Sequence, residues 1–126
     1  MTDGKRFLVV DDDATIVEIV SRILEYGFDV VSVDMAANAE EALCLLNASQ
    51  YDFLITDQLM PGMNGTVLIR EAIYLYPSLQ FILMSSYMDT RLRKEASELG
   101  VISLVLKPFE IDEFLRALPA DLASTS

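Results

Sequence analysis

Side chains able to do chemistry follow four separate apolar runs in this sequence. The residues concerned are Asp11, Asp12 and Asp13 after run 7–10, Asp57 after run 53–56, Ser85 and Ser86 after run 81–84, and Lys107 after run 101–106. A carboxylate that ends an apolar run must be ionised against a partner, bound to a metal or used in a reaction. We therefore treat these residues as candidates for one site.

The charges of this set indicate what the site would need. Two carboxylates about 4 Å apart repel each other by roughly 4 kcal/mol at an effective dielectric constant near 20. Lys107 supplies one positive charge, and a divalent cation could supply the rest. The chain has no histidine, so oxygen ligands favour Mg²⁺, Mn²⁺ or Ca²⁺ over zinc. Lysine, Mg²⁺ and a hydroxyl together suit phosphoryl chemistry, in which an aspartate can itself be the nucleophile.

The intervening sequence predicts the elements that position these residues. Apolar runs at 7–10, 30–33, 53–56, 81–84 and 101–106 alternate with helical patterns at 16–24, 38–46, 67–75, 89–99 and 111–118. Strands of this kind, alternating with helices, predict a parallel sheet covered on both faces. The strand ends then share one edge, where sites form in such sheets. The second strand, expected to end near Asp34, adds no further group.

Several residues are typical of helix ends. Asp13 suits the start of the first helix and Asp89 the start of the fourth, while Asn38 with Glu41 resembles a capping box. Gly100 suits the end of the fourth helix.

Composition narrows the class of protein. The 126 residues are 52% hydrophobic, which predicts one folded domain with a core of about residues 5–118 and a frayed tail at 119–126. A single cysteine, Cys44, excludes an internal disulfide, and no apolar run reaches the length of a membrane span. We therefore expect a cytoplasmic protein. The net charge of −11 argues against direct binding to nucleic acid or anionic membranes.

Four motifs follow one another along this pattern. They are Val9-Val10-Asp11-Asp12, Thr56-Asp57 with Met60-Pro61-Gly62-Met63-Asn64-Gly65, Ser85, and Lys107-Pro108-Phe109. Together they resemble the receiver domain of two-component response regulators, over residues 6–118. The resemblance implies a flavodoxin-like, doubly wound (βα)5 fold, with a five-stranded parallel sheet of order 2-1-3-4-5 and helices on both faces. It covers a single domain, 1–126, either stand-alone or part of a longer protein, with the stand-alone form slightly favoured.

The resemblance also implies a metal site. Asp12 and Asp57 would bind Mg²⁺ directly, with Mn²⁺ as an alternative ion. Asp11 would act largely through water, and the backbone carbonyl of Leu59 would complete the protein ligands.

The same resemblance assigns the phosphoryl chemistry. Asp57 would accept a phosphoryl group from a histidine kinase or a histidine phosphotransfer protein. Ser85 would bond one phosphoryl oxygen and Lys107 another, and the Lys107–Pro108 peptide bond would be cis. The domain would catalyse its own phosphorylation and dephosphorylation at Asp57 without being a turnover enzyme.

A switch is implied as well. Charge added at Asp57 would draw Ser85 and the loop before the fourth helix toward the phosphoryl group. The face formed by the fourth helix, fifth strand and fifth helix would then change its affinity for a downstream protein. We expect that face to include or adjoin Arg91, Leu92, Lys94, Leu104, Ile111 and Phe114. Leu104 stands where the family commonly has an aromatic residue, a role that Tyr87 could partly fill, and we expect a monomer or weak dimer.

Two other classes compete with this interpretation. Asp11-Asp12-Asp13-Ala14-Thr15 also resembles the Asp-x-Asp-x-Thr motif of haloacid-dehalogenase-like phosphatases, in which Asp11 would be the nucleophile. That family needs an acidic pair after the lysine strand, and nothing after Lys107 supplies it convincingly. A phosphorylation-independent interaction module is the third class, against which the intact acceptor, acidic pair and lysine argue.

Overall fold

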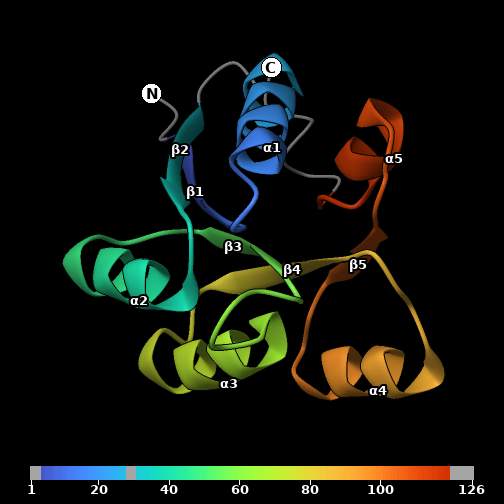
Figure 1. Ribbon diagram of the computed structural model, residues 1–126. Coiled ribbons are helices and arrows are strands. Elements are labelled where there is room, and N and C mark those ends of the chain that lie inside the picture. Colours follow the sequence, from blue (N-terminus) through green and yellow to red (C-terminus); the bar gives the residue numbers. More distant parts are fainter. Residues whose placement is uncertain (1–3, 28–30, 120–126) are drawn as a thin grey trace.

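The computed structural model describes residues 4–27 and 31–119, and in them five strands alternate with five helices (Figure 1). The strands are β1 (Lys5–Val10), β2 (Val31–Ala36), β3 (Phe53–Asp57), β4 (Gln80–Ser85) and β5 (Ser103–Leu106). The helices are α1 (Ala14–Gly27), α2 (Ala39–Ala48), α3 (Gly65–Leu75), α4 (Thr90–Glu98) and α5 (Ile111–Arg116). All strand pairs are parallel and the sheet order is β2-β1-β3-β4-β5. The predicted flavodoxin-like fold and strand order are confirmed.

Each face of the sheet has its own hydrophobic core, because side chains alternate along a strand. Helices α1 and α5 cover one face, and α2, α3 and α4 cover the other (Figure 1). On β1, Phe7 belongs to the α1 side and stacks on Phe53 with ring centroids 4.8 Å apart, whereas Leu8 belongs to the opposite core. The central strands are thus buried on both sides, as their continuous apolar sequences predicted.

The predicted helix caps are present. Asp13 Oδ1 accepts from the Thr15 N–H at 3.0 Å, and Asp89 Oδ1 accepts from the Leu92 N–H at 2.8 Å. Gly100, which follows α4, has a φ of 78°, a left-handed conformation that glycine adopts readily.

The expected capping box of α2 is only half present. Asn38 Oδ1 accepts from the Glu41 N–H, but the Glu41 carboxylate accepts from the N–H of Ala37 rather than from that of Asn38.

The end of the second strand differs from the prediction. Asp34 does not end β2 but lies within it, in register with Leu8, and pairing with β1 continues to Ala36. Its carboxylate accepts a hydrogen bond from the Tyr51 hydroxyl and lies 3.5 Å from Arg6 Nη2. These partners let an acidic residue occupy a strand at the sheet edge. Val30, predicted to belong to this strand, lies outside the described residues.

The last helix is shorter than its apolar pattern indicated. It ends at Arg116, although Leu118 beyond it is still buried. The Ser103 hydroxyl of β5 donates to the Ala117 carbonyl at 2.6 Å, which ties the chain after α5 back to the sheet.

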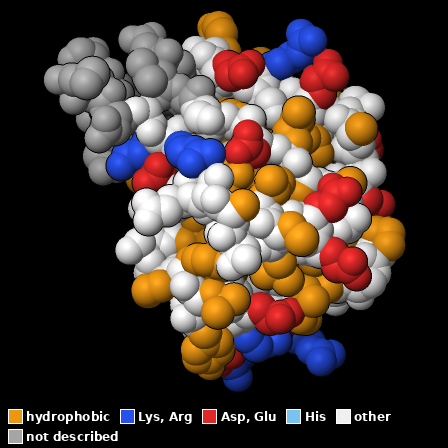
Figure 2. All heavy atoms as spheres, turned by 90° about the vertical axis from the view of Figure 1, so that its left-hand side faces the viewer, with side chains coloured by type: hydrophobic (Ala, Val, Ile, Leu, Met, Phe, Trp, Pro, Cys, Tyr) orange, Lys and Arg blue, Asp and Glu red, His pale blue; other side chains and the backbone are white. Residues whose placement is uncertain are grey.

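The surface carries separate groups of charge. On the face shown in Figure 2, basic side chains lie at the top, the upper left and the bottom; acidic side chains adjoin the upper groups, and hydrophobic and acidic side chains lie between. Within the described residues, no helix combines the length and apolar character needed to cross a membrane.

Candidate functional site

The parallel register brings the candidate residues to one edge of the sheet. Asp57 is the last residue of β3 and Ser85 the last of β4, while Asp11 follows β1 and Lys107 follows β5. Neighbouring strands end level with one another, with Asp57 paired to Met84. Four side chains far apart in the sequence therefore project from the carboxyl ends of four strands.

Three carboxylates form the centre of the site. Oxygens of Asp11, Asp12 and Asp57 all lie within 4.8 Å of one another. The side chains of Asp11 and Asp57 are only 1% and 10% exposed, whereas Asp12 is exposed to solvent. This oxygen-only donor set, partly buried and open on one side, fits a hard divalent cation such as Mg²⁺.

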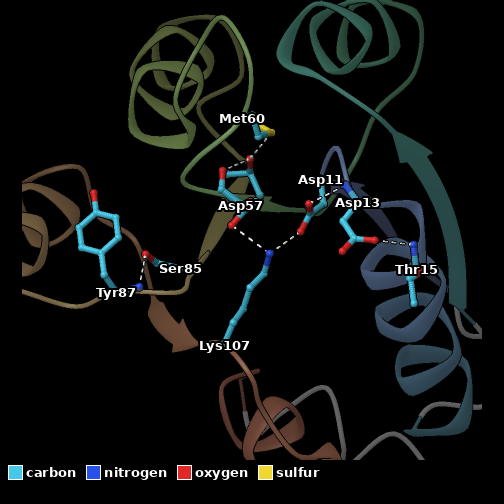
Figure 3. A network of polar contacts seen from close by, with 9 residues as sticks. Asp11, Asp13, Thr15, Asp57, Met60, Ser85, Tyr87 and Lys107 are labelled. Atoms are coloured by element: carbon cyan, nitrogen blue, oxygen red, sulfur yellow. Dashed lines mark hydrogen bonds and ion pairs between the residues drawn. The ribbon is translucent and has the colours of Figure 1, made fainter.

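Lys107 bridges the two buried carboxylates. Its Nζ lies 2.7 Å from Asp11 Oδ2 and 3.1 Å from Asp57 Oδ1 (Figure 3). The peptide bond between Lys107 and Pro108 is cis, as expected.

Burial and charge shift the pKa values in this cluster. Burial and the negative charge of Asp11 raise the pKa of Asp57, and its hydrogen bond and ion pair with Lys107 oppose this only in part. Burial alone would lower the pKa of Lys107, but hydrogen bonds and charges from Asp11 and Asp57 outweigh it and raise that pKa. The lysine therefore stays protonated, and a further cation beside Asp57 would favour the ionised form of its carboxyl group.

The first carboxylate is fixed in orientation by the start of α1. Asp11 Oδ1 accepts from the Asp13 N–H at 2.9 Å, while its other oxygen faces Lys107. Asp13 in turn caps α1 through Thr15 (Figure 3). The third aspartate of the run is thus a helix cap and not part of the acidic cluster.

Ser85 is buried beside the site and bonded away from the carboxylates. Its Oγ accepts from the Tyr87 N–H at 3.1 Å (Figure 3). Its carbonyl accepts from the Lys107 N–H at 2.7 Å. The hydroxyl is thus linked to the loop that precedes α4.

The loop from β3 to α3 has a close backbone contact that sequence reasoning did not identify. A Cβ at Gly65 would lie 2.4 Å from the Asp57 carbonyl oxygen and 2.9 Å from Leu83 Cδ1, so only glycine fits. Gly65 was quoted as part of a motif, but the close contact itself arises only once the strand and helix are packed.

Leu59 lies in this loop and is 53% exposed. A cavity of about 950 Å³ adjoins Asp12 between the loops that precede α2 and α3. It is lined by Asp12, Ala37, Asn38, Ala39, Glu40, Pro61, Gly62, Met63, Asn64 and Val67.

Fold and site together define a class: CheY-like α/β domains with an acidic cluster at the carboxyl edge of the sheet. The chain belongs to the response regulator receiver domain family, whose model matches residues 7–119. It is therefore a receiver domain of two-component systems, and the predicted resemblance is confirmed.

Individual response regulators also resemble this chain in sequence or in structure. The transcriptional regulatory protein CitT of Bacillus subtilis (strain 168) is 30% identical over 112 residues, which cover 87% of this chain and 49% of CitT. This chain thus spans about half of that relative. A CheY-like receiver from Methanospirillum hungatei JF-1 superposes with a TM-score of 0.83 at 28% identity, covering 90% of both chains. TrrA of Thermotoga maritima, solved in complex with Mg²⁺-BeF, gives a TM-score of 0.77 at 32% identity, covering 89% of this chain and 94% of that one.

Proposed function

We propose that this chain is a signalling switch that accepts a phosphoryl group on Asp57 from a histidine kinase or histidine phosphotransfer protein. The observation that carries this proposal is the meeting of Asp11, Asp12 and Asp57 with Lys107 at one edge of the sheet. The three aspartates supply oxygen ligands for Mg²⁺, and Lys107 forms an ion pair with the proposed acceptor, Asp57. These are the groups that phosphoryl transfer needs.

Each residue has a chemical role in the transfer. An Asp57 carboxylate oxygen attacks the phosphorus of the phosphohistidine, a P–O bond forms, the P–N bond breaks and the imidazole leaves. Lys107 pairs with a phosphoryl oxygen and the Ser85 hydroxyl donates to another. Asp11, Asp12, Asp57 and the Leu59 carbonyl would hold Mg²⁺, which supplies charge neutralisation of the phosphoryl oxygens.

Ser85 offers a physical route for the switch. Its Oγ already accepts from the Tyr87 N–H, so a move of Ser85 toward a phosphoryl oxygen would pull the segment that leads into α4. Phosphorylation adds up to about two negative charges and three acceptor oxygens, which provide the driving force.

The output surface would be the face of α4, β5 and α5. Arg91, Lys94 and Ile111 are exposed there and Leu104 is half-buried. Leu92 and Phe114, the other two members of the expected set, are 3% and 0% exposed and pack in the cores behind this face. Ile102 and Leu106, at 41% and 48% exposure, add apolar area that the sequence analysis did not include. A downstream protein is the proposed partner, and the absence of direct nucleic-acid binding stays a prediction.

The deciding experiment is intact-mass measurement after incubation with Mg²⁺ and a small acyl-phosphate donor. We expect one phosphoryl adduct on the wild type and none on Asp57→Asn or in metal-free buffer. An adduct that persists in Asp57→Asn but is lost in Asp11→Asn would instead indicate phosphatase-like chemistry at Asp11. No adduct under any condition would contradict phosphoryl transfer and leave an interaction module.

A further inference from the structure

The residue after the proposed phosphoacceptor is buried and extensively hydrogen-bonded. Gln58 is 3% exposed. Its N–H donates to the Met84 carbonyl at 2.8 Å, and its own carbonyl accepts from the Gly65 N–H at 2.9 Å. Its side-chain Oε1 accepts from the Thr66 N–H at 2.9 Å, and Nε2 donates to Thr66 Oγ1 at 3.2 Å. All four bonds belong to the residue that directly follows Asp57.

Gln58 therefore caps α3 from outside the helix. Asn64 occupies the N-cap position but its side chain makes no capping hydrogen bond. The first two N–H groups of the helix, those of Gly65 and Thr66, are bound instead by the carbonyl and side chain of Gln58. The start of α3 is thus attached to the end of β3 rather than to its own flanking residue.

The same bonds close the loop of residues 59–64. Gln58 precedes this loop and is hydrogen-bonded to Gly65 and Thr66, which follow it. The backbone of Gly65 also lies so close to the Asp57 carbonyl that no side chain fits between the two backbones. Met60 lies within the loop and is 7% exposed, so the loop is also anchored from inside. Because the Gln58 and Thr66 side chains are buried, loss of one partner leaves the other unsatisfied.

We propose that Gln58 and Thr66 are positioning residues for the cation site, fixing the Asp57 main chain and the loop that contains Leu59. This inference rests on the proposed function, in which Asp57 and the Leu59 carbonyl hold Mg²⁺. Mg²⁺ demands near-ideal octahedral geometry, so small displacements of either ligand weaken binding. Outer partners of metal ligands typically change metal affinity by about 10–100-fold when they are mutated.

The test compares Mg²⁺ dissociation constants by titration calorimetry. Gln58→Met keeps the side-chain volume and removes both side-chain hydrogen bonds, and we expect the constant to rise about 10-fold. Thr66→Val, which removes only the hydroxyl, should have a smaller effect in the same direction. Thr66→Ser keeps both bonds and should bind like the wild type. In Gln58→Met, amide hydrogen exchange should quicken in residues 59–66.

A control separates positioning from general loss of stability. Val20→Ala truncates a fully buried side chain of α1 in the core across the sheet from Thr66 and should lower the melting temperature without changing Mg²⁺ affinity. If Gln58→Met had the Mg²⁺ affinity and exchange rates of the wild type, or if Val20→Ala lost as much Mg²⁺ affinity as Gln58→Met, this inference would be overturned and the proposed function would stand. Failure of the wild type itself to bind Mg²⁺ would refute the proposed function and this inference with it.

Discussion

Replacing Lys107 by methionine tests how the buried carboxylates are held. Methionine keeps most of the side-chain volume but removes the ammonium that lies 2.7 Å from Asp11 and 3.1 Å from Asp57. The two carboxylates then face each other without a cation, and the Asp11 side chain is only 1% exposed.

The magnitude follows from this geometry. Asp11 and Asp57 oxygens within 4.8 Å of each other repel by roughly 3.5 kcal/mol or more at an effective dielectric constant of 20. Removal of one partner of a buried ion pair costs about 3–5 kcal/mol in measured cases. We expect Lys107→Met to lower the free energy of unfolding by about that amount near neutral pH. The melting temperature should fall by roughly 10–20 °C for a domain of this size.

The assay is thermal and urea denaturation with a chelator and then with Mg²⁺. Mg²⁺ should raise the melting temperature of Lys107→Met more than that of the wild type, because the ion meets no competing ammonium. Lowering the pH should also narrow the difference, because Asp57, whose pKa is already raised, loses the opposing effect of Lys107 and takes up a proton. Both recoveries would show that the lost stability is electrostatic.

Lys94→Met is the matched control, because Lys94 is exposed on α4 and its loss should change the free energy of unfolding by less than about 0.5 kcal/mol. Stability of Lys107→Met equal to that of the wild type in chelator would refute the reasoning. An equal rise in melting temperature on addition of Mg²⁺ to Lys107→Met and to the wild type would also refute it, since Lys107 would then not compete with the ion for the carboxylates.

Three further outcomes are expected. Gly65→Ala should lose at least about 1–3 kcal/mol of stability and bind Mg²⁺ more weakly by calorimetry, because its Cβ would meet the Asp57 carbonyl at 2.4 Å. Asp57→Asn should be more stable than the wild type to urea near neutral pH without metal, since the raised pKa means that folding disfavours the ionised carboxylate; the gain should disappear as the pH falls below that pKa. Burial and the Asp34 hydrogen bond raise the pKa of Tyr51 to about 12, so its stabilising contribution is complete below the usual value of 10.0 and is lost as the pH rises toward 12. Urea unfolding of Tyr51→Phe should show a smaller fall in stability over that interval.

The pattern of apolar runs was sufficient to predict the strands and the residues that meet at the sheet edge, whereas the strand order followed from the family resemblance. This success has a physical cause: in a parallel sheet every strand has the same direction, so residues at strand ends converge whatever their separation in the chain. Helix caps were also predictable, because Asp13 and Asp89 act on N–H groups two or three residues away.

Interactions that depend on packing across the chain could not be read in this way. The second strand was expected to end near Asp34, but Arg6 and Tyr51 from neighbouring segments accommodate this acidic residue within the strand. The sequence did not indicate the role of Gln58, because its hydrogen-bond partner Thr66 lies eight residues later, in the first turn of α3. Whether a side chain on the output face is exposed likewise depends on α5, whose six residues leave Ile111 open and bury Phe114.

The ion pair between Lys107 and Asp11 joins residues 96 positions apart, near opposite ends of the folded chain. A fragment that lacks β1 or β5 cannot form this pair, and the carboxylates that would bind a cation come from the ends of β1 and β3, so a cation at this site binds the folded domain rather than the unfolded chain. Binding then adds directly to the free energy of unfolding, by about 2.7 kcal/mol when the free ion is at 100 times its dissociation constant. Under the proposed function, Mg²⁺ at this site would therefore protect the domain against global unfolding as well as prepare it for phosphorylation.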